Sequence, residues 1–270
     1  NVNLSPELST SWTVGMVARV PTDDPWLNRL SLTVDYWSIS LEDTIGALAA
    51  TTILQRCFNL QGVNPTFDPN NPYCLLFERN PSDGRVDEMQ QFQNNIGAST
   101  NAGLDVALNW GFGLDQLGLG DRAGDLSFSL AGTWWHKSTS KTTITPLDPE
   151  NDFVGSISGV TAGAVPEFKF SFLTTYSRDD LMVQLNTRFI DAMVHANTIV
   201  GGVGTGVPST WYLDLSGRYN LTSNIAVRAG VNNLLDQQPR LYNPNVQANT
   251  DPSTYDVLGR RFFFGVNVSM

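Results

Sequence analysis

Residues 211–219 read Trp-Tyr-Leu-Asp-Leu-Ser-Gly-Arg-Tyr, and apolar and polar side chains alternate along them. One set of alternate positions is apolar: Trp211, Leu213, Leu215 and Tyr219. The set between them carries the polar groups: Tyr212, Asp214, Ser216 and Arg218. Because successive side chains of a β-strand point to opposite faces, this period of two predicts a strand with one apolar and one polar face.

The same alternation recurs along the whole chain. We expect nine strands, of which the other eight lie within 12–18, 30–39, 104–112, 126–135, 168–172, 181–189, 225–232 and 262–270. No segment shows a convincing helical period. The sequence therefore predicts an all-β fold.

Composition excludes several classes of protein. The chain has 26 acidic and 16 basic side chains among 270 residues, a net charge of −10, which argues against a nucleic-acid partner. Charged residues make up only 16%, compared with about 25% in ordinary soluble domains. No run of 18 apolar residues occurs, so we expect no transmembrane helix. Membrane β-barrels contain no such run either.

The expected connections alternate in length. Short ones fall at 21–26, 113–124, 177–180 and 220–223, and long ones at 42–85, 137–164, 191–210 and 235–260. Short turns at one end and long loops at the other are typical of an antiparallel up-and-down outer-membrane barrel. The polar faces are rich in Ser, Thr, Asn and Gln, which suits the wall of a water-filled lumen, and aromatic residues cluster near strand ends.

The two cysteines, Cys57 and Cys74, lie 17 positions apart in a polar stretch without neighbouring histidines. This favours a disulfide over a metal site, and with it an oxidising compartment, with free or buried thiols as the alternative. Neither His136 nor His195 stands near a nucleophile motif, so we expect no enzyme. Asp148, Glu150 and Asp152 lack the other parts of a calcium loop, and we expect no metal and no cofactor.

Several segments resemble the C-terminal barrel half of TonB-dependent outer-membrane receptors. The resemblance rests on Asn-Leu-Ser-Pro-Glu-Leu-Ser at 3–9, Asp-Tyr-Trp-Ser-Ile at 35–39, Gly-Leu-Asp at 103–105, Val-Asn-Asn-Leu-Leu-Asp at 231–236 and Tyr-Asp-x-Leu-Gly-Arg at 255–260. The loop that holds Cys57 and Cys74 is similar to that of a proteobacterial subset. The chain departs from the pattern at Met270, where the family most often ends on Phe.

The resemblance implies that residues 1–270 form one domain, the C-terminal part of a transmembrane β-barrel. They would supply about nine of its 22 strands, together with long extracellular loops. The plug domain and the N-terminal strands are absent from this sequence, and no signal-peptide pattern follows Asn1. A nine-stranded open sheet would leave two unpaired edges in hydrocarbon, where each unsatisfied group costs several kcal/mol. We therefore expect a portion of a longer receptor, from a split gene, a proteolytic product or a partial sequence.

The implied function is active transport of a nutrient across the outer membrane of a Gram-negative bacterium, for a siderophore, a vitamin or an oligosaccharide. The implied partners are the N-terminal barrel and plug portion, TonB–ExbB–ExbD through that plug, outer-membrane lipid and lipopolysaccharide, and a small nutrient ligand. The alternatives are a passive porin-like channel and a secreted soluble β-sandwich. Acidic side chains in 148–152 and 179–180 lean toward a neutral or carbohydrate-like cargo.

Ligand-binding candidates follow from the same resemblance, because these receptors hold substrate between the plug, the inner wall and the outer loops. Inward-facing charges near loop ends and loop aromatics that fit this place are Arg188, Asp214, Tyr242, Tyr255 and Arg261.

Overall fold

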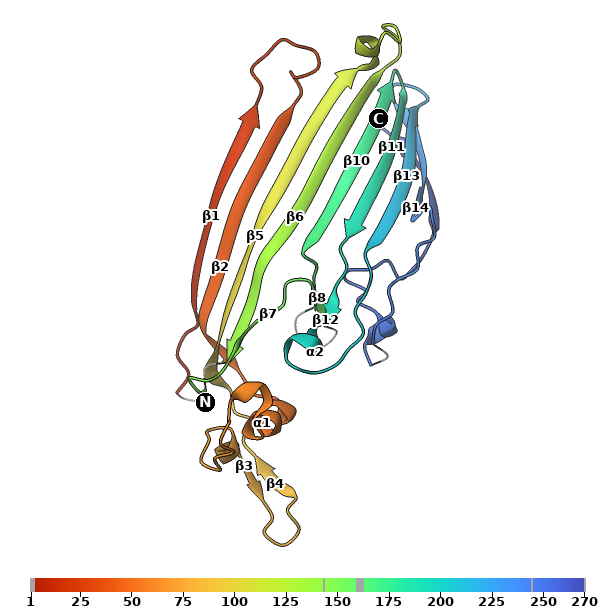
Figure 1. Ribbon diagram of the computed structural model, residues 1–270. Coiled ribbons are helices and arrows are strands. Elements are labelled where there is room, and N and C mark those ends of the chain that lie inside the picture. The colour runs from red at the N-terminus through yellow and green to blue at the C-terminus, as the bar shows by residue number, and fades with distance from the viewer. Residues whose placement is uncertain (1–2, 143, 159–162, 244, 270) are drawn as a thin grey trace.

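One curved antiparallel sheet dominates the computed structural model, which describes residues 3–142, 144–158, 163–243 and 245–269 (Figure 1). Its strands follow the order of the chain: β1 (Leu8–Arg19), β2 (Ser31–Gly46), β5 (Asn94–Gly113), β6 (Asp125–Thr142), β10 (Phe168–Arg178), β11 (Leu181–Ile190), β13 (Thr210–Asn220), β14 (Ile225–Asn232) and β15 (Arg261–Val268). A tenth strand, β7 (Glu150–Asp152), pairs with the end of β6. The all-β, up-and-down prediction is confirmed.

Several strands extend beyond the stretches that alternate in the sequence. β5 and β6 pair from Gly113 and Asp125 at one end to Gly97 and Thr142 at the other, with an irregularity between Ala102 and Gly103. The added end of β6 reads Lys-Ser-Thr-Ser-Lys-Thr. Polar residues on both faces are what a strand carries once both of its faces meet water, so the alternation stops while the pairing continues.

The connections sort into two ends of the sheet. Short turns lie at the upper end of Figure 1, and the long loops lie at the lower end, where the segment 47–93 projects farthest. The long loops carry β3 (Phe77–Arg79), β4 (Val86–Met89), β8 (Ser156–Ser158), β9 (Gly163–Val165), β12 (Val194–His195), α1 (Ala50–Cys57), α2 (Ala196–Ile199), η1 (Leu60–Gly62), η2 (Cys74–Leu76) and η4 (Gln247–Asn249). A further 3-10 turn, η3 (Leu114–Leu117), lies at the short-turn end.

The expectation that the chain contains no helix is wrong for α1. This helix spans eight residues and has no side-chain N-cap, so it offers too little periodic pattern to find in a polar loop. Its stability comes from burial of Ile53, Arg56 and Cys57 against the rest of the loop. None of the helices in the described ranges has both the length and the apolar character needed to cross a membrane.

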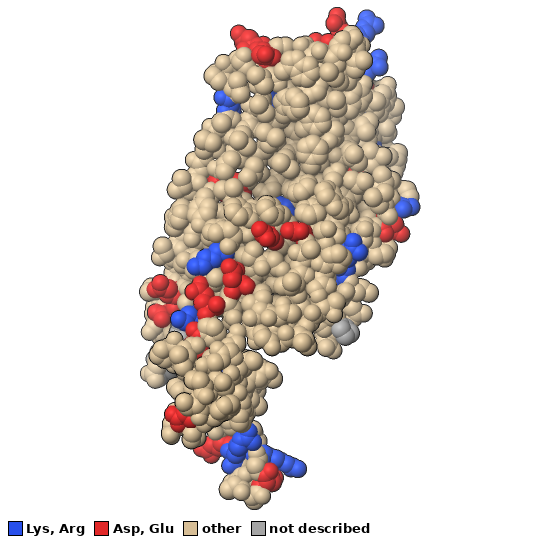
Figure 2. Space-filling model, in the orientation of Figure 1, with Lys and Arg blue, Asp and Glu red and all other residues tan. Residues whose placement is uncertain are grey.

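The two faces of the sheet meet different surroundings. In β15, Phe262 and Phe264 expose 76% and 72% of their surface, and the aligned residues of β14, such as Val231, lie on the same face. The opposite face carries Asn, Ser, Gln and the inward charges that are described below. Figure 2 shows few charged side chains over the upper half of the strands, between groups at the short-turn end and toward the long loops.

Aromatic side chains lie on the apolar face at both ends of β10 and β13, and Phe172 lies between the ends of β10. Phe168 and Trp211 lie toward the long-loop ends of β10 and β13, and Tyr176 and Tyr219 toward their short-turn ends. Positions 211 and 219 are separated by 219 − 211 = 8 residues, roughly 25 Å along a strand, which is the scale of the apolar band of a membrane barrel. The placement is that of two interfacial girdles.

Buried cores occur in the loops rather than against the sheet. The largest fully buried side chains lie in the long loops or at the strand ends and bends that meet them: Tyr73, Tyr212, Ile53, Ile157, Val63, Asn64, Asn233, Thr210, Thr250 and Ser156. One apolar cluster surrounds Tyr73 and the cysteines, and a second surrounds Tyr212. The apolar face of the sheet is therefore covered by no second layer in the described part of the chain.

The sheet is open at both sides. Within the described ranges, β1 pairs only with β2 and β15 only with β14. All twelve residues of β1 are exposed. Two rows of backbone donors and acceptors therefore remain available for pairing with further strands.

Candidate functional site

An ion pair lies on the polar face of the sheet near the long loops. Arg188 of β11 donates from Nε to Asp214 Oδ2 of β13 at 3.0 Å and from a terminal nitrogen to Oδ1 at 3.3 Å. The Arg188 guanidinium also lies 4.9 Å from the ring centroid of Tyr212. The register places Asn186 directly opposite Asp214 and Arg188 opposite Tyr212, so the pair is diagonal across two strands. Half-burial makes it stronger than an exposed pair.

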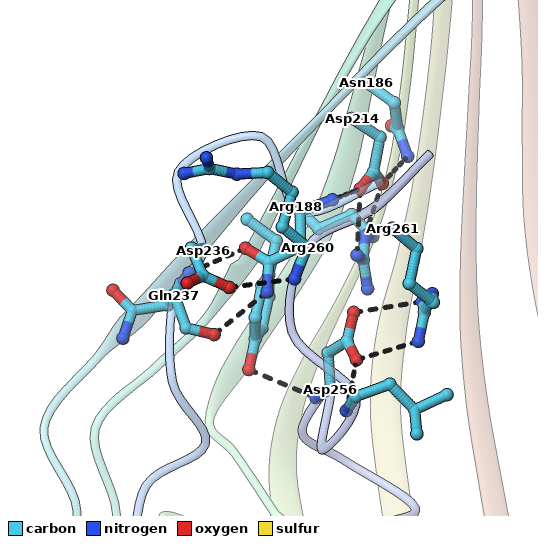
Figure 3. A network of polar contacts seen from close by, with 11 residues as sticks. Asn186, Arg188, Asp214, Asp236, Gln237, Asp256, Arg260 and Arg261 are labelled. Atoms are coloured by element: carbon cyan, nitrogen blue, oxygen red, sulfur yellow. Dashed lines mark hydrogen bonds and ion pairs between the residues drawn. The ribbon is translucent and has the colours of Figure 1, made fainter. Parts of the chain in front are cut away.

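The turn that follows β14 docks on the same carboxylate. The backbone N–H of Asn233 donates to Asp214 Oδ1 at 2.8 Å, and the buried Asn233 amide exchanges two hydrogen bonds with the backbone of Gln237 (Figure 3). Asn233 and Asp236 both have a positive φ, of 53° and 54°. Asp214 thus fixes a tight turn as well as an arginine.

The segment before β15 closes onto that turn. Asp236 Oδ1 accepts the backbone N–H of Arg260 at 2.9 Å, and Asp256 forms a bidentate pair with Arg261 at 3.1 Å for both contacts (Figure 3). Gly259 has a φ of +72°, and a Cβ there would lie 2.9 Å from Asp236 Oδ1. A glycine is required at 259 by both its conformation and this close approach.

The five ligand-binding candidates are partly brought together. Arg188 and Asp214 bind each other, and Arg261 binds Asp256 in the adjoining turn. Tyr242 and Tyr255 expose only 7% and 2% of their surface, because both rings pack in the apolar cluster around Tyr212. Burial raises the pKa of both phenols. In this arrangement the two rings form a loop core, and a ligand role for the five residues stays a prediction.

A hollow of about 480 Å³ lies on the inner wall beside this network. The charged side chains on its lining are Asp35, Asp105, Lys169 and Arg188. Asp35 and Asp105 are register partners on β2 and β5, and Asp105 accepts a hydrogen bond from Thr133 at 2.7 Å. The rest of its lining is mostly apolar, and an apolar hollow with a few charged groups can bind a solute that has hydrogen-bonding groups.

Sequence reasoning missed three of those four charges as site residues, although the signal was present. Asp35 and Lys169 already stood on the polar faces of alternating stretches, and Asp105 on the polar side of Gly103-Leu104-Asp105. What the sequence lacked was the order and register of β2, β5, β6 and β10, which bring the three onto one patch.

A cross-linked unit connects the 47–93 loop with the β6–β7 loop, between the sheet and the projecting β3–β4 hairpin (Figure 1). Cys57 and Cys74 are joined by a disulfide, as predicted. Next to the two cysteines in sequence stand Arg56 and Tyr73. Tyr73 donates to Asp148 Oδ1 at 2.7 Å, and Arg56 donates to Asp148 at 2.8 Å and to Tyr73 Oη at 2.5 Å. The Asp148 side chain has no exposed surface, and its other oxygen accepts the N–H groups of residues 144 and 145. We call residues 56, 57, 73, 74 and 148 the loop clamp.

Three of the acidic side chains behind the neutral-cargo prediction do not line the entrance to the wall. Asp148 points into the loop clamp and is neutralised by Arg56. Asp179 and Asp180 form the β10–β11 turn, at the end of the sheet opposite the long loops. No group of three or more His, Cys, Asp or Glu side chains in the described ranges is arranged to hold a metal ion.

Comparison with known families identifies the barrel type. A family model described as "TonB dependent receptor-like, beta-barrel" matches residues 1–234. The chain belongs to this family. The resemblance drawn from the sequence motifs is thereby confirmed, and the family is one of transport receptors rather than enzymes.

Solved structures of TonB-dependent receptors share the fold. The chain resembles a mutant of the ferric enterobactin receptor PfeA from Pseudomonas aeruginosa (18% identity, TM-score 0.59, 100% of this chain and 32% of that one). It also resembles the siderophore receptor PirA from Acinetobacter baumannii (15%, TM-score 0.55, 100% and 33%) and the copper transporter OprC (14%, TM-score 0.55, 100% and 32%). The chain thus spans about a third of the length of these structures. A comparison with curated proteins gave no match.

Two of the receptor motifs in this chain contact each other in the structure. Val231–Asp236 and Tyr255–Arg260 lie far apart in sequence and meet through the Asp236 contact with Arg260 and the glycine at 259. Together they close the β14–β15 loop against β13 through Asn233 and Asp214. In this TonB-dependent receptor barrel, the two motifs therefore set the geometry of the last hairpin.

Asp214→Ala is expected to lower the free energy of unfolding of the barrel by about 2–3 kcal/mol, because hydrogen bonds to a charged group are lost at Arg188 and Asn233. Urea unfolding of the detergent-solubilised receptor, followed by tryptophan fluorescence, measures the change. Asp121→Ala in the exposed β5–β6 turn is the control, expected within about 0.5 kcal/mol of wild type. Equal midpoints for the two variants would contradict the structural role of Asp214.

The loop clamp is expected to open in alkali. Burial first, and the hydrogen bond with Asp148 second, raise the pKa of Tyr73 well above its ordinary value of 10.0. Below about pH 10 the phenol is protonated in both the folded and unfolded loop, so stability is unchanged there. Above it the unfolded loop gains stability by ionising, so the clamp weakens as the pH rises. An alkaline titration followed by tyrosinate absorbance at 295 nm measures this. The Tyr73→Phe variant should show one fewer tyrosine that ionises only at high pH than the wild type does.

Proposed function

We propose that residues 1–270 form the C-terminal wall and outer loops of a TonB-dependent active transporter for nutrient uptake in the outer membrane of a Gram-negative bacterium. The observation that carries the proposal is the exposed apolar face of the sheet, which has an aromatic row at each end and a polar face opposite. That division suits a wall between lipid and a water-filled lumen. In a soluble sandwich the same apolar face would be buried under a second layer.

The open edges support completion by further strands. Unpaired backbone groups cost several kcal/mol each in hydrocarbon, so β1 and β15 need partners in a membrane. We propose that the remaining strands and a plug domain come from polypeptide outside residues 1–270, consistent with the threefold greater length of the matched receptors. The plug would pass energy from TonB–ExbB–ExbD, and outer-membrane lipid and lipopolysaccharide would surround the wall.

The cargo proposed is a small polar nutrient complex that enters from the long-loop end. The matched structures include ferric enterobactin and pyoverdine receptors and a copper transporter, so a metal–chelate is the first class to test, ahead of vitamins and oligosaccharides. The hollow with Asp35, Asp105, Lys169 and Arg188 lies on the inner wall in its path. Both signs of charge there suit a solute with several hydrogen-bonding groups.

The first experiment determines whether the protein is in the outer membrane, and the second determines whether its transport depends on TonB. Purified outer membranes should yield a band that migrates differently with and without boiling, as folded barrels do. Uptake of a radiolabelled ferric siderophore should fall on deletion of the gene and of tonB alike. Recovery of the protein in the soluble fraction would contradict the membrane wall. Steady conductance of the intact receptor in planar bilayers, without denaturant, would instead favour the passive porin-like channel.

A further inference from the structure

Two arginines face each other on the polar side of the sheet near its short-turn end. Arg218 of β13 and Arg228 of β14 are direct register partners. Arg218 shares its face with Asp214 and Ser216, because alternate residues of a strand point the same way. Both side chains are exposed to the lumen side. Like charges directly opposite each other in an antiparallel pair are destabilising.

Neither guanidinium has a carboxylate partner within the described residues. Arg218 Nε donates to Asn220 Oδ1 at 3.2 Å, and Arg228 forms no ion pair there. The inward arginines nearer the long loops behave differently, since Arg188 and Arg261 each bind an aspartate of this chain. Among the inward arginines of β11, β13, β14 and β15, the two without a carboxylate partner in the described residues therefore lie at the short-turn end.

The pair borders a hollow of about 270 Å³, whose lining includes Gln184, Ser216, Phe263 and Asn267 as well as both arginines. The Arg228 side chain lies across Gly265 of β15, where a Cβ would come within 2.9 Å of its Nε. This contact directs the guanidinium along the wall. Planar guanidinium groups bind carboxylates through paired N–H donors, which gives both charge and orientation.

We propose that Arg218 and Arg228 bind a carboxylate of an acidic segment from the lumen-filling domain of the same receptor, polypeptide that lies outside residues 1–270. This rests on the proposed function. Charge complementarity selects an anion. The position selects a protein segment, because Arg218 lies two residues before the end of β13 at Asn220, far from the loops through which a solute would enter. The matched receptors are long enough to supply that domain, since this chain covers 32% of one of them.

Site-directed photocross-linking in the full-length receptor tests the contact. Ser216→Cys places a thiol beside the arginine pair, and labelling with a benzophenone maleimide leaves the disulfide-bonded Cys57 and Cys74 unmodified. Illumination followed by mass spectrometry should capture a peptide from outside residues 1–270 that contains Asp or Glu. The matched control is Leu215→Cys on the opposite face, expected to give at least fivefold less of that product.

The arginines are then varied in the Ser216→Cys background. The double variant Arg218→Gln/Arg228→Gln should reduce the cross-link at least fivefold, whereas Arg218→Lys/Arg228→Lys should retain most of it. In planar bilayers, the double glutamine receptor should conduct at about 1 M less urea than wild type, since losing charged hydrogen bonds weakens the lumen contact.

Two outcomes would overturn the inference: a captured peptide without acidic residues, or a yield and urea threshold unchanged in the double glutamine variant. Heat-modifiable migration of the same unlabelled samples separates the two proposals. A folded, heat-modifiable barrel with an unchanged cross-link rejects the arginine contact alone. If the wild-type receptor shows no heat-modifiable migration, the proposed function is rejected.

Discussion

Leu215→Arg is expected to destabilise the inserted barrel by about 2–4 kcal/mol, because it places a charge on the lipid-facing side near the middle of the membrane. Leu215 lies midway between Trp211 and Tyr219 on β13 and shares its face with Val231 of β14. The measurement is the urea midpoint for unfolding from lipid vesicles, together with the fraction of protein that becomes heat-modifiable.

The neighbouring position supplies a matched control. Ser216→Arg introduces the same side chain one residue along the strand, on the lumen side. Repulsion from Arg218 and Arg228 there is expected to cost only about 0.2–1 kcal/mol, which is less than the cost of a charge in lipid. A sheet with two equivalent solvents would show no such difference. If the two variants insert and unfold alike, the assignment of the apolar face to lipid is wrong, whatever the family.

Asp148→Asn is expected to open the 47–93 loop at its loop clamp. The substitution keeps the shape of the side chain but leaves the buried Arg56 guanidinium without its counterion, and breaking a buried pair from one side costs about 3–5 kcal/mol. Within the described residues, none of the hydrogen bonds of the Arg56 and Asp148 side chains goes to a strand of the main sheet. Protease cleavage within residues 47–93 of the folded receptor should therefore accelerate about 100-fold or more, with strand stability unchanged.

Two further variants define the cause. Asp87→Asn removes an exposed carboxylate of β4 and should leave the cleavage rate at its wild-type value. Arg56→Met/Asp148→Leu removes both charges and should recover most of the resistance, because the buried cation is gone as well. Equal cleavage of Asp148→Asn and wild type would show that the disulfide alone holds the unit.

Strand existence could be predicted from the sequence because the two faces of the sheet meet different solvents. The alternation of apolar and polar residues at 211–219 and 225–232 results from that difference. The observed bounds of β13 and β14 agree closely with these two stretches. The ends of β5 and β6 could not be predicted, because a strand with water on both faces shows no alternation of apolar and polar residues. α1 was missed because eight residues hold too few turns to establish a period.

The candidate site was predictable only as a set of faces. Arg188 and Asp214 were both placed on the inner wall, but their contact depends on the diagonal register of β11 and β13. Tyr242 and Tyr255 show the opposite limit. The sequence does not distinguish a loop tyrosine that contacts a ligand from one that packs in a core. Here both rings are enclosed by side chains from distant parts of the sequence.

The long loops, which face the outside of the cell in the proposed transporter, carry their own buried cores, disulfide and ion pair. Their exposed residues can therefore be exchanged without loss of either the membrane wall or the loop scaffold. Phages and antibodies that recognise the receptor would contact these exposed loop residues first. Under such pressure we expect substitutions to accumulate at exposed positions such as Phe67 and Leu75, while Tyr73 between them stays fixed.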